Sequence, residues 1–326
     1  MSNFFQLVKN EQNKLYILKS TWAMYIALFI LVIVGAFILK AFNDEMAIPE
    51  YSENWEQELM AENEQLAEEI ETWQNDDSFG WDGMIDYNNS LIAKNNYYVD
   101  NRIEPPSYDG WVYLFDNVGL SSFISLFTII VGAGIVANEF KWGTIKLLLI
   151  RPVSRTKILI AKYVSVLLFA LTTLAFLMVS SLLVGSLFFG LNGLNPAMVI
   201  ETSNGLGEST YLLESLKQFG FDSINLVMMA TLAFMISTIF RSSSMAIGVA
   251  IFLMFSGNII VNALSNYEWA KYILFANTNL QQYFNGSGPM FEGMSLSFSI
   301  IVLIVYYVIF LGLSWLAFTK RDVAGH

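Results

Sequence analysis

Six long apolar stretches dominate this sequence and limit the folds that it can adopt. A bilayer core of about 30 Å needs roughly 20 mostly apolar residues in a helix. The stretches that approach or exceed this length are Trp22–Phe42, Trp111–Val136, Ile158–Gly190, Ile224–Phe240, Met245–Leu264 and Leu296–Phe318. Only 14% of the 326 residues are charged, whereas soluble domains carry about a quarter. The sequence therefore predicts a polytopic membrane protein.

The same stretches predict which secondary structure crosses the bilayer. Strands of a membrane barrel alternate apolar and polar residues, whereas these stretches are apolar throughout. Helices satisfy their backbone hydrogen bonds within one segment. We therefore expect an all-α fold of six transmembrane helices, with residues 21–42 as the first span. The chain has no cysteine, which excludes disulfides and thiolate chemistry.

The basic residues predict the orientation of these spans. If the N-terminus is inside, 12 of the 17 Lys and Arg residues fall in inner segments, as the positive-inside rule requires. We therefore expect a multi-pass protein of the cell membrane with both termini in the cytoplasm. Residues 1–20 have an apolar face that includes Val8 and Leu15, opposed by Lys9 and Lys14. This pattern predicts an amphipathic helix lying in the inner interface.

Two segments are expected outside the cell. Residues 43–110 hold 18 acidic residues and two basic ones, and predict a mostly helical extracellular domain. Its clearest helical stripe is Trp55, Leu59, Leu66, Ile70 and Trp73. The acidic surface either captures cationic peptides or forms a lid, or it only keeps the domain soluble. Residues 266–293 are rich in aromatic side chains, which indicates a re-entrant loop or a simple interfacial loop.

The spans lack the residues that membrane chemistry needs. No ionisable residue lies at a span centre, and the single histidine is His326. Proton-driven pumps and intramembrane hydrolases require such groups. No Gly-x-x-x-x-Gly-Lys-Ser/Thr phosphate loop occurs in the chain. We therefore expect no catalytic site, no metal site and no cofactor in this chain, and we do not expect it to be an enzyme.

Positive charge concentrates instead between the second and third spans. Six of the 17 basic residues lie between Lys141 and Lys162. Residues 138–151 predict a short amphipathic helix with Glu139 in its first turn, followed by Pro152. Ser154 is a suitable N-cap for the third span. Alternatively, these basic residues only set the topology of the chain. That would explain the positive charge, but it would not explain a helix with Glu139 in its first turn and Pro152 after its end.

This segment, "NEFKWGTIKLLLIRPVSRTKILIAKY", resembles the internal loop of ABC type-2 exporter permeases. In those proteins a Glu is followed by Gly-Thr, a Leu-rich helix, and then Pro and Ser/Thr-Arg before the third span. The matching residues are Glu139, Gly143, Thr144, Leu147, Leu148, Pro152, Ser154 and Arg155. The interfacial N-terminal helix, the six spans and the aromatic segment before the last span are similar as architecture.

The resemblance implies a function. Residues 138–151 would be the coupling helix that docks on a separate ATPase. The residues expected to contact or position that ATPase are Glu139, Lys141, Trp142, Gly143, Thr144, Lys146, Arg151 and Arg155. The partners would be two cytoplasmic ABC ATPase subunits, which hold ATP and Mg, and a second permease, identical or related. The implied activity is ATP-driven export of an amphiphile such as a peptide, a lipid or a hydrophobic drug.

Two other classes of function stay open. The chain is alternatively an ATP-independent binding or immunity protein that acts through residues 43–110. In that case the internal segment would tolerate substitution, whereas changes to the outer acidic residues would abolish function. A membrane-embedded hydrolase or transferase would need a polar cluster at one depth, and the sequence offers none. Nothing in the composition indicates a nucleic-acid partner.

Overall fold

The computed structural model describes residues 2–42, 51–75, 80–144, 153–202, 205–284 and 288–320. The chain divides into two compact units. The first unit comprises Met1–Val32, Asn117–Ser180 and Lys217–His326, and the second comprises Ile33–Asp116 and Ser181–Leu216. Both units are mostly helical, as the apolar patterning predicts.

Six helices are long and apolar enough to cross a membrane. They are α2 (Lys19–Ala41), the segment Gly110–Lys141, α9 (Arg155–Phe189), α10 (Tyr211–Phe240), α11 (Ser243–Ala263) and α13 (Leu296–Lys320). The second segment consists of α6 (Gly110–Asp116), a 3-10 turn η1 (Asn117–Leu120) and α7 (Ser121–Lys141). Each expected span is present, and α10 begins well before the expected Ile224. Ser154 caps α9 through a hydrogen bond from the Lys157 backbone N–H to its hydroxyl at 3.4 Å.

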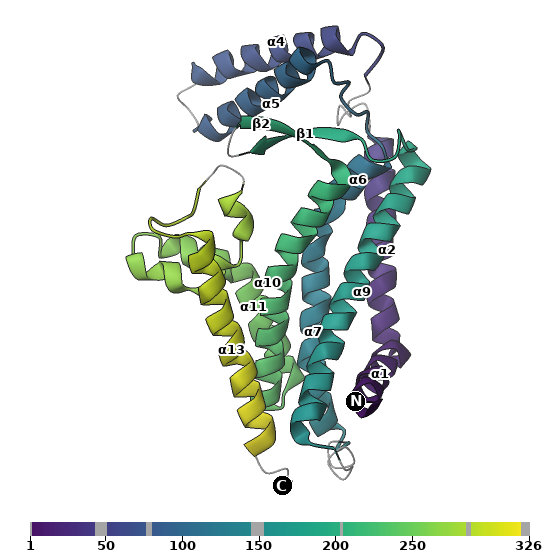
Figure 1. Ribbon diagram of the computed structural model, residues 1–326, viewed down its shortest axis with the longest axis vertical. Helices are drawn as coiled ribbons and strands as arrows, with labels where there is room; N and C mark the ends of the chain where they lie inside the picture. The colour runs from purple at the N-terminus through teal and green to yellow at the C-terminus, as the bar shows by residue number, and fades with distance from the viewer. Residues whose placement is uncertain are drawn as a thin grey trace. The chain divides into compact units, whose positions relative to one another are not determined.

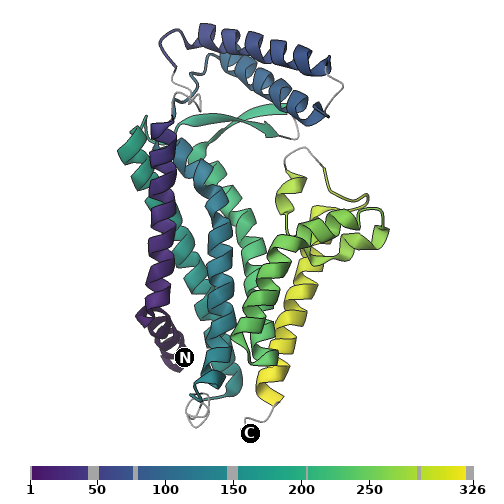
Figure 2. The same cartoon turned by 180° about the vertical axis from the view of Figure 1, so that it is seen from behind.

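The core of the first unit lies where α7, α10, α11 and α13 meet (Figures 1 and 2). Small residues line the contacts, including Ala133 on α7, Ala233 on α10 and Ala250 on α11, each fully buried. Small side chains let membrane helices approach closely, which increases their van der Waals contact. Leu303 and Phe310 of α13 fill the remaining space in this core.

The N-terminal helix α1 (Ser2–Ile17) is separate from α2, and Leu18 lies at the bend between them. The Thr21 hydroxyl donates to the Leu15 carbonyl at 2.5 Å, and the Trp22 indole donates to the Tyr16 carbonyl at 2.9 Å. These bonds satisfy carbonyls at the end of α1 that have no partner within the helix. The face of α1 that contains Val8 and Leu15 is buried, as its amphipathic pattern predicts.

The segment before α13 is built from short helical turns. They are η2 (Glu268–Tyr272), α12 (Leu274–Asn277) and η3 (Leu280–Tyr283). Buried Asn277 connects them to α13, because its side-chain oxygen accepts a hydrogen bond from the Ser299 hydroxyl at 2.7 Å. The Tyr283 hydroxyl shares the same serine at 2.7 Å. A re-entrant position for this segment in the bilayer stays a prediction.

In the second unit, α4 (Trp55–Gln74) pairs with α5 (Asp82–Asn101) (Figure 1). Leu59 is fully buried and the other residues of the predicted stripe are partly buried, whereas most of their neighbours are exposed. The Asn95 side chain donates to the Asn63 side chain at 3.0 Å, and Trp73 stacks on Trp81 at 5.5 Å. The stripe therefore faces the second helix, as its spacing predicts.

The fold is mostly helical, as expected for the all-α class, and it contains one small sheet that the sequence did not predict. It is an antiparallel pair of β1 (Ala197–Thr202) and β2 (Gly205–Thr210), with Val199 opposite Glu208. A lone hairpin is marginally stable in water and needs packing against other structure. Helix α5 supplies it, because Tyr98 accepts a hydrogen bond from the Val199 backbone N–H at 3.1 Å. Lys94 also forms an ion pair with Glu201 at 3.3 Å.

Asp109 organises the start of the second span from within the second unit. This fully buried carboxylate accepts hydrogen bonds from the backbone N–H groups of Trp111 at 2.8 Å, Val112 at 3.2 Å and Asn192 at 3.0 Å. It thereby caps α6 and holds the segment that follows α9. The next residue, Gly110, allows close packing, because a Cβ there would lie 2.7 Å from the Ser186 hydroxyl.

We predict that Asp109→Ala destabilises the protein by about 1–3 kcal/mol, the cost of leaving buried hydrogen-bond donors unpaired. Asp109→Asn retains a capping oxygen and should recover part of this loss. Thermal unfolding in detergent, followed by intrinsic fluorescence, measures both effects. The matched control is Asp100→Ala, because Asp100 is exposed on α5. Equal unfolding temperatures for Asp109→Ala and the wild type would contradict this role.

Candidate functional site

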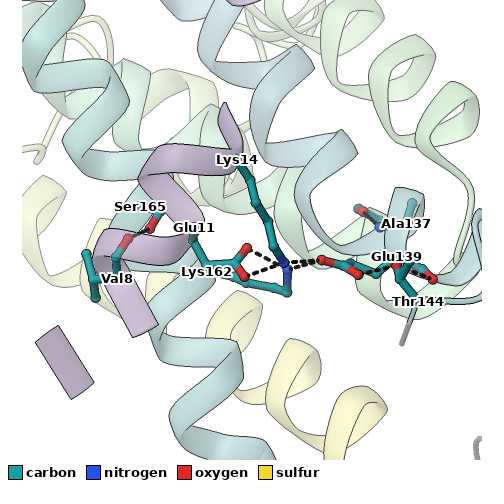
Figure 3. Close-up of polar contacts among 9 residues, drawn as sticks. Val8, Glu11, Lys14, Ala137, Glu139, Thr144, Lys162 and Ser165 are labelled. Atoms are coloured by element: carbon teal, nitrogen blue, oxygen red, sulfur yellow. Dashed lines mark hydrogen bonds and ion pairs between the residues drawn. The ribbon is translucent and has the colours of Figure 1, made fainter. Parts of the chain in front are cut away.

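Four charged side chains meet where α1, the end of α7 and the start of α9 come together (Figure 3). Lys162 lies 2.7 Å from a Glu11 oxygen and 3.1 Å from a Glu139 oxygen. Lys14 lies 2.8 Å from Glu11 and 2.7 Å from the same Glu139 oxygen. Each carboxylate therefore bridges two ammonium groups, and the four formal charges cancel. We call Glu11, Lys14, Glu139 and Lys162 the charge cluster.

Three of the four side chains in the charge cluster are buried. The side chain of Lys162 is 1% exposed and those of Glu11 and Glu139 are 8% exposed, whereas Lys14 is 52% exposed. Moving an ion out of water costs several kcal/mol, which only close partners offset. The three buried side chains therefore need one another, and Lys14 closes the cluster on its solvent side.

The charge cluster joins α1 to the rest of the first unit. Burial acts to lower the pKa of Lys14, but hydrogen bonds to Glu11 and Glu139 outweigh burial and raise this pKa above its ordinary value. Because this pKa is raised, the contribution of Lys14 to the stability of the fold is fully present at neutral pH and is lost only in strongly alkaline solution. Two more bonds run beside the charge cluster, from the Gln12 amide to the Ser165 carbonyl at 2.7 Å and from the Ser165 hydroxyl to the Val8 carbonyl at 3.4 Å.

Glu139 lies in the last turn of α7, so its expected place in the first turn of a separate helix was wrong. A carboxylate is unfavourable at the negative C-terminal end of a helix, and here two ammonium groups compensate it. Gly143 ends the helix with a φ of 70°, a left-handed conformation typical of glycine at this position. Its backbone N–H donates to the Phe140 carbonyl at 3.1 Å.

Thr144, which follows the end of α7 at Lys141, is joined to the charge cluster, because its hydroxyl hydrogen-bonds the second Glu139 carboxylate oxygen. Lys141 and Trp142 are exposed, and Trp142 is 60% accessible. The turn thus presents two of the predicted partner-contacting residues. Lys146 and Arg151, together with the rest of residues 145–151 of the predicted helix 138–151, lie outside the described residues.

Arg155 has a partner within the chain. Its guanidinium donates to the Thr319 carbonyl at 3.2 Å, in the last turn of α13. The next residue, Thr156, accepts a hydrogen bond from the Trp315 indole at 3.0 Å. A cation near the last carbonyls of a helix is stabilising. The structure therefore gives Arg155 a role in joining α9 to α13, and its expected contact with an ATPase stays a prediction.

Sequence reasoning missed three of the four cluster residues, although two of them carry a signal. Glu11 lies between Val8 and Leu15 at helical spacing, on the apolar face of α1. Lys162 lies inside the apolar run that begins at Ile158. A charge on an apolar face must find a partner of opposite sign.

Among the described residues, no group of three His, Cys, Asp or Glu residues is placed to hold a metal ion.

We predict that Lys162→Met lowers the free energy of unfolding by about 3–5 kcal/mol, because it leaves buried carboxylates without compensation. The double variant Lys162→Met with Glu11→Leu restores the charge balance and should be more stable than Lys162→Met alone. Thermal unfolding of the purified protein in detergent measures both changes. Lys157→Met is the matched control, because Lys157 is exposed on the same helix. Similar unfolding of the Lys157 and Lys162 variants would show that the charge cluster is not needed.

Comparisons with known proteins relate the chain to a protein family. Residues 84–324 match the family described as "Protein of unknown function (DUF2705)". The chain is 39% identical over 330 residues to "Uncharacterized protein YhcI" of Bacillus subtilis (strain 168), across 98% of this chain and 99% of that protein. It is 33% identical over 213 residues to "Uncharacterized membrane protein YdbK" of the same organism, across 65% of this chain and 82% of that protein. The chain therefore belongs to the DUF2705 family.

Proposed function

We propose that this chain is the permease subunit of an ATP-driven ABC exporter. Separate cytoplasmic ATPase subunits, two per complex, hold ATP and Mg, and they drive a pair of six-helix permeases between inward and outward access. The second permease is an identical or a related chain. The transported molecule is an amphiphile, since the six candidate spans are apolar and mostly uncharged.

The observation that carries the proposal is the connection between the internal segment and three helices. Within residues 138–151, Thr144 hydrogen-bonds Glu139, and Glu139 forms ion pairs with lysines on α1 and α9. A force applied to the segment would therefore act on α1, α7 and α9 together. This is the mechanical property that a coupling element requires, because packed helices move as units between discrete arrangements.

Two further features support the proposal. The internal segment resembles the coupling region of ABC type-2 exporter permeases in its Glu139, Gly143-Thr144 and Pro152 pattern. The exposed Lys141 and Trp142 lie at the turn where an ATPase would contact the permease. In this proposal both termini are cytoplasmic, and the acidic residues 43–110 are extracellular, where they would attract cationic peptides.

We predict that Trp142→Ala weakens binding of the partner ATPase by about 2 kcal/mol, or roughly 30-fold, as expected for a buried interfacial tryptophan. The permease is co-expressed with the candidate ATPase and co-purified in detergent, and ATP turnover is compared with that of the ATPase alone. The matched control is Trp269→Ala, because Trp269 is 55% exposed in the segment before α13.

Normal co-purification and ATP turnover with both Trp142→Ala and Lys141→Glu would refute docking at this turn. If function in cells survives these changes but fails when outer glutamates are neutralised, the chain is instead a binding protein that acts without ATP. Thermal unfolding of each variant separates a lost contact from a lost fold. Because Lys141 and Trp142 lie outside the charge cluster, neither change should lower stability by more than a few tenths of a kcal/mol.

A further inference from the structure

A polar cavity of about 380 Å³ opens in the first unit between α7, α10 and α11. All three helices are apolar enough to cross a membrane, and they lie next to one another in Figure 1. The polar side chains that line the cavity are Ser121, Ser122, Ser125, Asp222, Asn225 and Asn258. Six polar side chains around one hollow are unusual on membrane helices, where polar groups are costly and mark functional sites.

Asp222 provides the charge of this cavity. One of its carboxylate oxygens accepts a hydrogen bond from the Ser121 hydroxyl at 2.5 Å. Among the described residues that line the cavity there is no Lys, Arg or His. The charge cluster differs, because there two lysines compensate each carboxylate. Among the described residues that line the cavity, the Ser121 hydroxyl is the one group with a hydrogen bond to the Asp222 carboxyl group.

Four other polar side chains of the cavity are unpaired. Ser122, Ser125, Asn225 and Asn258 make no hydrogen bond to the residues that the structure describes. Their hydroxyl and amide oxygens are acceptors. Ser122 and Asn258 are exposed and Asn225 is partly exposed, whereas Ser125 is almost fully buried. The carboxylate and these oxygens together match a group that carries a positive charge and several N–H donors.

The remaining wall is apolar. Met254 and Phe255 of α11 line the cavity, and the Phe255 ring is 65% exposed. A cation over an aromatic face is attracted to it, and the effect is larger where water is excluded. Asp222 lies about 17 Å of helix from the start of α10 at Tyr211 and about 27 Å from its end at Phe240, at 1.5 Å per residue. The cavity is open to its surroundings, because Ser122, Phe255 and Asn258 are exposed.

We propose that this cavity binds the primary ammonium group of an amphiphile, with Asp222 as its counter-ion. The Ser and Asn oxygens accept the N–H groups, and Met254 and Phe255 contact the apolar part of the ligand. A lysine side chain in an apolar peptide and a long-chain amine share this chemistry. The site does not depend on the proposed partner ATPase, since it is formed by this chain alone.

The test uses the purified full chain in nanodiscs of phosphatidylcholine, a lipid with no net charge. The probe is dansylcadaverine, a primary ammonium on a short carbon chain with a fluorescent apolar ring. Its N-acetylated form has the same ring and chain without the charge. We expect saturable binding of the amine and a weaker affinity for the acetylated probe, by about tenfold or more, as for loss of a charge-assisted hydrogen bond.

Asp222→Asn should weaken binding of the amine by the same factor and leave the affinity for the acetylated probe unchanged. Asp116→Asn is the matched control, because Asp116 bonds Tyr108 and lies outside this cavity. If Asp222→Asn does not fold, Asn258→Leu decides, since Asn258 is exposed and leucine removes its amide from the wall of the cavity without a change in the buried core. Equal binding by wild type and both cavity variants, equal binding of the two probes, or no binding above empty nanodiscs would overturn the proposal.

Discussion

The buried ion pairs of Lys162 are the interaction on which the arrangement of the first unit depends. A lysine inside an apolar helix is tolerated only if a carboxylate reaches it, and Glu11 and Glu139 arrive from two different helices. The position of α1 is thereby determined, because moving α1 away removes Glu11 from Lys162. Compared with a well-packed apolar core, buried ion pairs add little net stability. Their effect here is on arrangement, since they specify which helix ends come together.

The rest of the first unit is held by contacts of another kind. Ala133, Ala233 and Ala250 allow close helix packing, and hydroxyl groups make short bonds between helices. The Ser237 hydroxyl of α10 donates to the Ala133 carbonyl of α7 at 2.6 Å, and the Tyr163 and Thr231 hydroxyls lie 2.7 Å apart. Such neutral bonds are each worth about 1 kcal/mol. The strongest directional contacts therefore concentrate at the end of the unit where the internal segment leaves α7.

Much of this architecture could be predicted from the sequence, because the patterns involved are local. Span length follows from bilayer thickness, and the Trp55–Trp73 stripe follows from helical periodicity. The β1–β2 hairpin could not be predicted from the sequence, because its strands are stabilised by Tyr98 and Lys94 of a helix far away in the chain. Glu139 was misplaced for a similar reason. A glutamate before a Leu-rich run matches the start of a helix, whereas Gly143 ends α7 just after it, and contacts with Lys14 and Lys162 compensate the carboxylate there.

The most direct test of this account is hydrogen–deuterium exchange of α1 in nanodiscs, comparing wild type with Glu139→Gln. Glutamine preserves the size of the side chain and removes the charge that joins Lys14 to Lys162. If the charge cluster holds α1, α7 and α9 as one body, the amides of residues 2–17 should exchange many times faster in the variant, while α4 and α5 stay unchanged. Unchanged protection of α1 would contradict the account, because α1 would then be held by its apolar face alone.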